Sequence, residues 1–338
     1  MQFIAGIRER AAASRRRIVF PESADPRTLA AVAVLAAERI CEPVLLLDPA
    51  RAETHAAARA TGVETIDIGA SVVADATAQR LLERRRAKGL TDAAAAALAR
   101  DTVYAGAAMV AAGAADGSVA GAERTTADVL RAALWLIGAA PGVSTVSSAF
   151  YMVVPPFRGG EEETLTFTDC AVVPTPTAEQ LADIAIAAAD DRRAIVGDEP
   201  RIAMLSFSTR GSGSGPSVEL VQHATALVRA RRGDLAVDGD LQGDAALIQQ
   251  VAERKAAGSV VAGIANVLVF PSLDAGNIAY KLVQRLAHAS AVGPIIQGLA
   301  KPCSDLSRGA VPDDIINVAA ITALQAGRRR DSSKKGIV

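Results

Sequence analysis

Residues 17–47 read RIVFPESADPRTLAAVAVLAAERICEPVLLL, and this stretch decides the fold class. Its first four residues, of which the last three are apolar, form a short run that stops at a proline. Residues 25–40 are rich in Ala, Val and Leu, and their proline falls in the first turn, where a helix accepts one. Residues 43–47 are continuously apolar, as in a strand that is buried on both faces. The stretch therefore predicts a strand, a helix and a second strand.

The same alternation continues along the first half of the chain. The pattern predicts a short amphipathic helix before residue 17 and then strands at 64–69 and 118–122, with helices at 75–89, 91–114 and 125–137. Alternating strands and helices are typical of an α/β protein with a mostly parallel, doubly wound sheet.

A second segment begins near residue 145. Its expected strands are 147–154, 164–169, 201–207, 235–238, 267–270 and 293–297, and its expected helices are 177–189, 218–230 and 277–288. A last helix is expected at 312–326. Because a chain of 338 residues is too long for one ordinary compact core, we expect two domains.

The composition excludes several classes of protein. Half of the residues are hydrophobic but only 3% are aromatic, which suits aliphatic helices packed on a buried sheet. The net charge of -1 gives no excess that would recruit nucleic acid or a membrane surface. No apolar run reaches the roughly 18 residues that a membrane-spanning helix needs.

The cysteines and histidines form no recognisable site. Each type occurs three times, without a C-x-x-C pair or a cluster, at Cys41, Cys170, Cys303, His55, His223 and His288. Neither a disulfide framework nor a protein-built metal site is indicated. The Arg-rich N-terminus contains an acidic residue, Glu9, which fits a transit peptide poorly. We therefore expect a cytoplasmic protein.

The densest group of polar residues is the segment 301–314, KPCSDLSRGAVPDD, which follows a predicted strand and precedes a predicted helix. In parallel α/β sheets ligands bind at such junctions. Ser307, Arg308 and Asp314 supply a hydroxyl, a guanidinium and a carboxylate. The alternative interpretation is ordinary turn chemistry, with acidic residues favouring a helix start.

A second candidate is the loop 206–215, SFSTRGSGSG, which also follows a predicted strand. Its backbone N–H groups, hydroxyls and one arginine could hold phosphate oxygens, although it lacks the closing sequence of a Walker A loop. The alternative is a flexible linker. The residues that would bind are Ser206, Ser208, Thr209, Arg210 and Gly211.

A third candidate is the helix that opens at Thr125 and Thr126. Arg131 lies on this helix, three residues after Asp128, and could simply form an exposed ion pair with it. The basic run 84–86 could likewise be a solvated surface.

Many segments together resemble the phosphate acetyltransferase family. They are FPE (20–22), TT and VLR (125–131), FTDC (167–170), MLSFST (204–209), DGDLQ (238–242), ANVLVFP (265–271), AGNIAYK (275–281), GPIIQGLAKP (293–302) and DLSRG (305–309). The resemblance runs from about residue 8 to 326 and implies two α/β domains with a cleft between them, similar in architecture to isocitrate dehydrogenase.

The resemblance also implies the domain boundaries and the reaction. Residues 1–144 plus 299–330 would form the first domain and residues 145–298 the second, and the basic tail 331–338 is expected to be disordered. The enzyme would be a homodimer, with no metal and no permanently bound cofactor. It would convert acetyl-CoA and phosphate to acetyl phosphate and CoA, and back.

The family's reacting centre maps onto Ser307, Arg308 and Asp314, and its two substrate-binding arginines map onto Arg85 and Arg131. Four positions depart from the family's pattern, and they leave the preferred acyl chain open: Ala133, Arg210, Gly243 and Ile264. Mechanistically, Asp314 would take the proton of the CoA thiol as the sulfur attacks acetyl phosphate. Arg308 would favour the thiolate, and Ser307 would orient the thiol or the developing oxyanion.

Three alternatives remain from the sequence. One is an acyltransferase that prefers butyryl or propionyl groups. Another is a domain without catalytic activity that binds acetyl-CoA as a regulatory module. The third is a nicotinamide dehydrogenase, which the fold alone suggests, although the G-x-G-x-x-G fingerprint is absent after the first strand.

Overall fold

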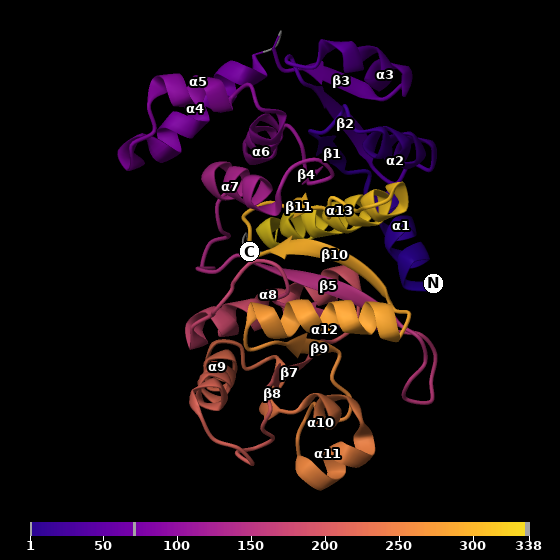
Figure 1. The fold of residues 1–338 in the computed structure, drawn as a ribbon, viewed down its shortest axis with the longest axis vertical. Helices are drawn as coiled ribbons and strands as arrows, with labels where there is room; N and C mark the ends of the chain where they lie inside the picture. The colour runs from indigo at the N-terminus through magenta and orange to yellow at the C-terminus, as the bar shows by residue number, and fades with distance from the viewer. Residues whose placement is uncertain (1, 70–71, 335–338) are drawn as a thin grey trace. The chain divides into compact units, whose positions relative to one another are not determined.

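The structure is a computed structural model that describes residues 2–69 and 72–334 (Figure 1). The chain forms two compact units. The middle unit is Gly142–Gly298, and the terminal unit combines Gln2–Pro141 with the chain from Leu299 onward. Each unit has its own sheet, and each is described by itself below.

The sheet of the terminal unit has the strand order β11-β4-β1-β2-β3, and every pair of neighbours is parallel. The strands are β1 (Arg17–Phe20), β2 (Glu42–Leu47), β3 (Glu64–Asp67), β4 (Gly117–Ala120) and β11 (Cys303–Asp305). The chain runs outward from β1 to β3 and then returns to β4 on the other side of β1. The winding therefore reverses between β1 and β4, and ligands of such sheets bind at the carboxyl ends of the strands at this point.

Helices cover both faces of this sheet. They are α1 (Gln2–Ser14), α2 (Pro26–Ala37), α3 (His55–Ala60), α4 (Val73–Arg85), α5 (Asp92–Leu98), α6 (Thr102–Ala112), α7 (Thr126–Leu136) and α13 (Pro312–Lys334), with short 3-10 turns at Ala52–Thr54 and Arg86–Lys88. A Cβ on Gly106 of α6 would touch Val19, and one on Gly117 would touch Thr322 of α13 and Ile18. Since successive side chains of a strand point to opposite faces, α6 and α13 lie on opposite faces of the sheet.

The middle unit has the strand order β10-β5-β6-β9-β7-β8. Its strands are β5 (Ser147–Val154), β6 (Glu163–Thr168), β7 (Arg201–Leu205), β8 (Ala236–Leu241), β9 (Val267–Val269) and β10 (Ser290–Gln297). Its helices are α8 (Ala178–Ile195), α9 (Pro216–Arg231), α10 (Gly243–Leu247), α11 (Gln249–Lys255) and α12 (Leu273–Leu286). β5 pairs antiparallel with both β10 and β6, and the other pairs are parallel.

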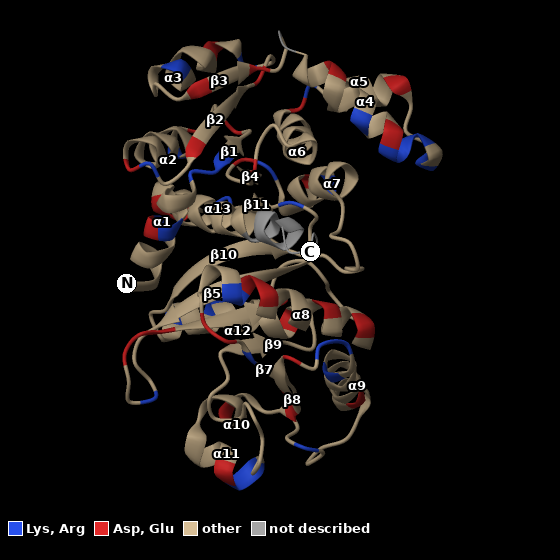
Figure 2. Cartoon of the chain, turned by 180° about the vertical axis from the view of Figure 1, so that it is seen from behind, with Lys and Arg blue, Asp and Glu red and all other residues tan. Residues whose placement is uncertain are grey.

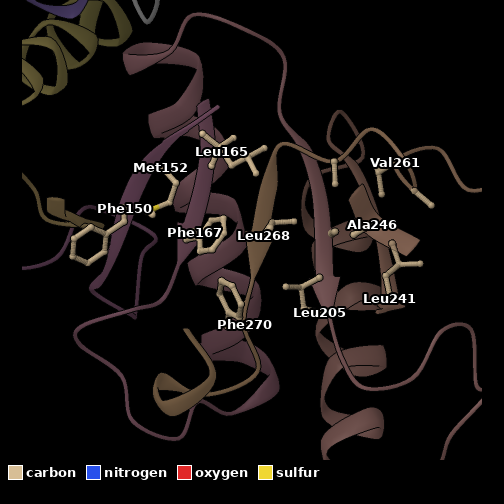
Figure 3. Close-up of a cluster of buried hydrophobic side chains, with 14 of the residues drawn as sticks. Phe150, Met152, Leu165, Phe167, Leu205, Leu241, Ala246, Val261, Leu268 and Phe270 are labelled. Atoms are coloured by element: carbon tan, nitrogen blue, oxygen red, sulfur yellow. The ribbon is translucent and has the colours of Figure 1, made fainter. Parts of the chain in front are cut away.

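Aromatic and aliphatic side chains fill one face of this second sheet (Figure 3). The rings of Phe167 and Phe270 lie 5.3 Å apart, and Phe150 stacks on Tyr280 of α12 at 4.0 Å. These contacts join β5 to α12 and β6 to the residue that follows β9.

The expected fold class is confirmed, since both units are α/β and their sheets are mostly parallel. Several element boundaries differ from the predicted ones, and two segments differ in kind. The helix expected at 91–114 is two helices, because the Asp101 side chain accepts the N–H of Val103 and begins α6. The segment 301–314 is not all loop, because residues 303–305 form β11 and pair with β4.

The C-terminal end also differs from the expectation. The last helix runs to residue 334, whereas the sequence predicted its end at 326 and disorder from 331. Arg and Lys are strong helix formers, and cations near a helix C-terminus interact favourably with its dipole. Residues 335–338 lie outside the described residues.

Candidate active site

One buried carboxylate organises the loops at the C-terminal ends of the strands in the terminal unit's sheet. Glu22 lies two residues after the end of β1 and is 5% exposed. Its Oε2 accepts the N–H groups of Gly121 and Ala122 at 2.9 and 2.8 Å, and its Oε1 accepts those of Glu123 and Arg124 at 3.0 and 2.8 Å. Four successive N–H groups after β4 thus converge on one side chain. This arrangement fixes the loop that leads into α7.

The start of α7 is also joined to β11. Thr126, the first residue of α7, places its Oγ1 2.6 Å from Oδ2 of Asp305, the last residue of β11. The neighbouring Thr125 is the N-cap, and its Oγ1 accepts the N–H of Asp128 at 3.2 Å. The two threonines predicted from sequence therefore have different roles, because one caps the helix and the other contacts a buried acid.

Arg27 ties the DLSRG loop to the same edge. Its Nη1 donates to the carbonyls of Arg308 and Ala310 at 2.7 and 3.0 Å, and its Nη2 donates to the carbonyl of Ala122 at 2.7 Å. Asp25 holds the guanidinium in place through hydrogen bonds of 2.6 and 3.0 Å. A single side chain of α2 therefore positions both loops.

The three residues predicted at the reacting centre are exposed on this loop and at the start of α13. Oγ of Ser307 accepts the N–H of Gly309 at 3.2 Å. Oδ2 of Asp314 accepts the N–H of Val311 at 3.0 Å, as an acidic residue in the first turn of a helix commonly does. The structure thus brings Ser307, Arg308 and Asp314 together on one short surface segment.

The two predicted substrate-binding arginines meet at an aromatic pair. The guanidinium of Arg85 lies 4.4 Å from the centre of the Trp135 ring, and this ring lies 6.2 Å from that of Tyr104 in an edge-on arrangement. Arg131 bonds to the hydroxyl of Tyr104 and forms an ion pair with Asp128 at 2.9 Å. Burial raises the pKa of Tyr104, while both arginines act to lower it, so the hydroxyl stays neutral near pH 7.

The neighbours of Arg85 have other tasks. Arg84 donates to the carbonyl of Trp135 at 2.8 Å and so binds near the C-terminus of α7. Arg86 pairs with Asp92 at 2.6 Å where both side chains are mostly exposed. Figure 2 shows basic residues toward the end of α4, which lies beside α5. The three consecutive arginines therefore make different contacts: Arg84 binds the Trp135 carbonyl, Arg85 lies over the Trp135 ring, and Arg86 pairs with Asp92.

A cavity of about 320 Å³ opens beside Glu22 at the carboxyl ends of β1, β2 and β4. Its wall includes two ion pairs, Arg51 with Glu123 at 3.0 Å and Arg124 with Asp101. Because both arginines have acidic partners and Glu22 and Asp48 also line the wall, this cavity presents net negative rather than positive charge.

The loop 206–215 lies in the middle unit. Most of its hydrogen-bond donors already bond to acceptors within the loop or to Asp238 and Asp240. The N–H of Gly211 donates to Oδ2 of Asp240 at 3.1 Å, and that of Arg210 donates to the carbonyl of Asp240 at 3.0 Å. Arg210 itself bonds to Asp238 at 3.1 Å and to the carbonyl of Ala257 at 2.8 Å. The phosphate-binding role expected for this loop stays a prediction, and it would require these bonds to be replaced.

The hydroxyl groups of that loop are engaged as well. Ser208 and Thr209 are buried. Oγ of Ser208 accepts the N–H of Gly213 at 2.9 Å, Oγ of Ser206 accepts the N–H of Ser208 at 3.2 Å, and Oγ1 of Thr209 accepts the N–H of Gln242 at 3.0 Å.

Two further observations concern the residues that the structure describes. Within them, no group of three or more His, Cys, Asp or Glu side chains is placed to hold a metal ion. None of the helices in this described part of the chain has the length and apolar character needed to cross a membrane.

Sequence reasoning missed three residues that organise the site: Glu22, Arg27 and Asp305. Glu22 and Asp305 lay within segments that carry the family resemblance, but their partners are about 100 and 180 residues away in sequence. Only the parallel pairing of β1, β4 and β11 brings them together. A carboxylate two residues beyond a predicted strand is the signal that could have pointed to Glu22, whereas Asp305 ends a strand that the sequence did not predict.

Fold and site together define a doubly wound α/β protein with polar loops at the carboxyl edge of one sheet. The family model described as "Phosphate acetyl/butaryl transferase" matches residues 2–323. The chain therefore belongs to the phosphate acetyl/butaryl transferase family.

Individual relatives agree with this assignment. The chain is 48% identical to a phosphate acetyltransferase of Thermoanaerobacterium thermosaccharolyticum, over 96% of this chain and 100% of the relative. A crystal structure of a phosphotransacetylase from Streptococcus pyogenes matches with a TM-score of 0.88 and 41% identity, over 96% of this chain and 98% of the other. The EutD phosphotransacetylase from Staphylococcus aureus matches with a TM-score of 0.85 and 38% identity, again over 96% and 98%.

Proposed function

We propose that this protein is a phosphate acetyltransferase that interconverts acetyl-CoA and phosphate with acetyl phosphate and CoA. The family and the full-length relatives support the reaction. The observation that carries the proposal is the DLSRG loop, which Arg27 fastens to the edge of the sheet while Ser307 and Arg308 stay exposed.

The reaction needs no covalent enzyme intermediate. In the direction of acetyl-CoA, the CoA sulfur attacks the carbonyl carbon of acetyl phosphate, a carbon–sulfur bond forms, and phosphate leaves with the electrons of the carbon–oxygen bond. The thiol proton goes to a base, which we assign to Asp314. One of its oxygens bonds to the N–H of Val311, and the other remains available on the exposed side of the helix start.

Proton transfer from thiol to carboxylate is uphill in water. A free thiol has a pKa of about 8.5 and a free Asp about 3.9, and the gap corresponds to about 6 kcal/mol. A cation beside the sulfur lowers this cost, which is the role we assign to Arg308. Ser307 orients the thiol or donates to the developing oxyanion. Arg85 and Arg131, and the N-terminus of α7 with Thr126, hold phosphate oxygens, while Thr125 caps the helix.

Cys303 is adjacent to this loop but is not suited to be a nucleophile. It is 3% exposed, and burial raises the pKa of its thiol to about 12. A neutral, buried thiol is a poor nucleophile near pH 7, so direct transfer between the substrates is favoured over an acyl-enzyme.

The assignment of Asp314 can be tested against its neighbour. Asp313 is exposed in the same first helical turn and pairs with Arg8 at 2.8 Å. Asp314→Asn should lower kcat by about 100-fold, the effect of losing a general base, with little change in either KM. Asp313→Asn should keep a rate within about twofold of the parent. Equal rates in the two variants would remove Asp314 from the mechanism.

The preferred acyl group is part of the proposal. We assign acetyl because the full-length relatives are named phosphate acetyltransferases. Rates with acetyl, propionyl and butyryl phosphate at saturating CoA test this. The highest kcat/KM with butyryl phosphate would keep the mechanism and change the substrate. Tight acetyl-CoA binding without turnover would instead favour the regulatory-module alternative.

We further infer a cytoplasmic homodimer with CoA as substrate and without nucleic acid or membrane partners. The three cysteines are free and buried, which fits a reducing compartment. On α12 the exposed side chains Ile278, Leu282 and Leu286 recur every four residues along one face. Asp274 and Arg285 lie near opposite ends of this face, so antiparallel pairing of two copies would bring unlike charges together. Leu282→Glu should therefore produce a monomer in sedimentation analysis.

A further inference from the structure

Asp305 is the one acidic residue at this site whose carboxyl group is fully enclosed by the described residues. Its Oδ2 lies 2.6 Å from Oγ1 of Thr126, but its Oδ1 is buried without a hydrogen-bond partner in the described part of the chain. Gly121 packs directly against Oδ1, because a Cβ at that glycine would collide with it. An ionised carboxylate with one unpaired oxygen in such a place is strongly disfavoured, whereas the neutral acid is not.

The groups around Asp305 add to this effect. From the turn after β1, the charge that faces it is the carboxylate of Glu22, which has the same sign. Thr126 of α7 faces it with an uncharged hydroxyl, and the Cys303 thiol on its own strand is kept neutral by burial. From α13, the group at this strand is the hydroxyl of Thr322, which bonds to Ser304 at 2.8 Å.

The cation that joins these loops is already committed elsewhere. Arg27 of α2 donates to three loop carbonyls and to Asp25, and it makes no hydrogen bond with Asp305. Burial, with a smaller contribution from Glu22, raises the pKa of Asp305 to about 7 against the opposing effect of the Thr126 hydroxyl and the backbone N–H of Leu306, so the acid titrates near neutral pH.

We propose that the proton on Asp305 decides in which direction the Thr126 hydroxyl donates, which makes Asp305 a positioning residue for the phosphate group of the substrate. The neutral acid donates its proton to Oγ1 of Thr126, and the Thr126 hydroxyl then points its own proton outward. The ionised acid can only accept, so the same hydroxyl proton turns inward to Asp305. No proton is exchanged with the substrate in either state.

The outward proton of Thr126 has a natural acceptor. Thr126 is half-buried at the first residue of α7, where the helix N-terminus favours an anion, and Arg131 lies further along the same helix. Thr125 cannot take over this role, because its hydroxyl group caps the helix and donates to Asp128 at 2.8 Å. Ionisation of Asp305 therefore removes one donor and adds one negative charge beside the phosphate. This inference rests on the proposed function.

The test is the KM for acetyl phosphate at saturating CoA between about pH 6 and about pH 8.5, on either side of the pKa. The wild-type KM should rise about tenfold across this range, the size expected when one donor to a charged group is lost. In Asp305→Asn the amide group still donates to Thr126 at every pH, so its KM should stay at the low-pH value of the wild type. Dividing each variant's KM by that of the wild type cancels the titration of the substrates.

A second pair of variants keeps the test valid if Asp305→Asn does not fold. Thr126→Ser retains the hydroxyl and should keep the rise of KM with pH. Thr126→Val lacks it and should show a raised KM with a smaller rise, because only the added charge of the ionised Asp305 still acts on the phosphate. A rise in Thr126→Val equal to that of the wild type, or an Asp305→Asn curve parallel to the wild type, would overturn the inference while leaving the proposed function intact. A wild-type protein that forms no acetyl-CoA would instead overturn the proposed function.

Discussion

The two polar loops predicted from the sequence end in different states. In the middle unit, Asp240 receives the N–H of Gly211, and Arg210 is bound to Asp238. In the terminal unit, Glu22 likewise receives the four N–H groups of residues 121–124 in the loop after β4. Ser307 and Arg308, in the loop after β11, nevertheless remain exposed. A glycine-rich loop is therefore a candidate ligand site only where the protein's own carboxylates leave donors unused.

The largest expected effect is the loss of stability when a side chain is added at Gly121. This glycine has φ +110°, and an added Cβ would lie 2.6 Å from the N of Leu306 and 2.8 Å from its carbonyl oxygen. Gly121→Ala should destabilise the protein by more than about 3 kcal/mol, because backbone atoms must move. Thermal unfolding measures this loss.

Gly62→Ala is the matched control. Gly62 also has a positive φ, +74°, but an added Cβ there would meet no heavy atom within 4 Å. It should cost only about 1 kcal/mol, the usual strain of a non-glycine residue in this region. Equal losses in the two variants would show that conformation, rather than packing between β4 and β11, makes Gly121 necessary.

The next effect tests whether Arg27 holds the DLSRG loop. Arg27→Met keeps much of the side-chain volume and removes all hydrogen bonds to the carbonyls of Ala122, Arg308 and Ala310. We expect kcat to fall by about 100-fold, since a displacement of about 1 Å in a catalytic group has effects of that size. Steady-state kinetics with a parallel melting curve separate this from unfolding. An unchanged kcat would mean that the loop holds its shape without Arg27.

The sequence predicted most of the fold because its strands are apolar runs and its helices begin at Thr, Ser, Asp or Pro. It did not predict β11, since Cys303, Ser304 and Asp305 show no apolar alternation and become a strand only beside β4. It did not predict the break before α6, because alanines continue through it and only the Asp101 cap marks it. The roles of Ser307, Arg308 and Asp314 were predicted from the family resemblance. A resemblance predicts the roles of residues but not the hydrogen bonds that hold them in place.

A smaller effect concerns the stability contributed by Asp305. Its pKa of about 7 in the folded state lies above the ordinary value of 3.8, so the folded protein binds this proton more tightly. The folded state is therefore favoured below about pH 4, and this contribution is lost as the pH rises to about 7. Asp305→Asn should gain stability relative to the wild type over that interval, by a few kcal/mol at most. The difference in Tm between the two proteins should be larger at pH 8 than at about pH 5, and a constant difference would contradict the raised pKa.

The smallest expected effects are changes in KM and Tm that distinguish the three arginines at the end of α4. Arg85→Gln should raise the KM for acetyl phosphate about tenfold, since it removes the cation over Trp135. Arg84→Gln should lower Tm by a few degrees through the lost bond to the Trp135 carbonyl. Arg86→Gln should change neither quantity, because its pair with Asp92 is exposed. A raised KM for acetyl phosphate in Arg86→Gln would move the predicted substrate contact from Arg85 to Arg86.

The most direct test of the account is the rate of thioester formation from acetyl phosphate and CoA, followed by absorbance, in Arg308→Gln and Arg210→Gln. The account predicts that Arg308→Gln lowers kcat by at least about 100-fold, as loss of a stabilising charge at the reacting centre does. Arg210→Gln should lower Tm and leave the chemical step within about threefold, since its bonds are internal to the middle unit. A full rate in Arg308→Gln together with a lost rate in Arg210→Gln would contradict the account and place the chemistry at the loop of the middle unit.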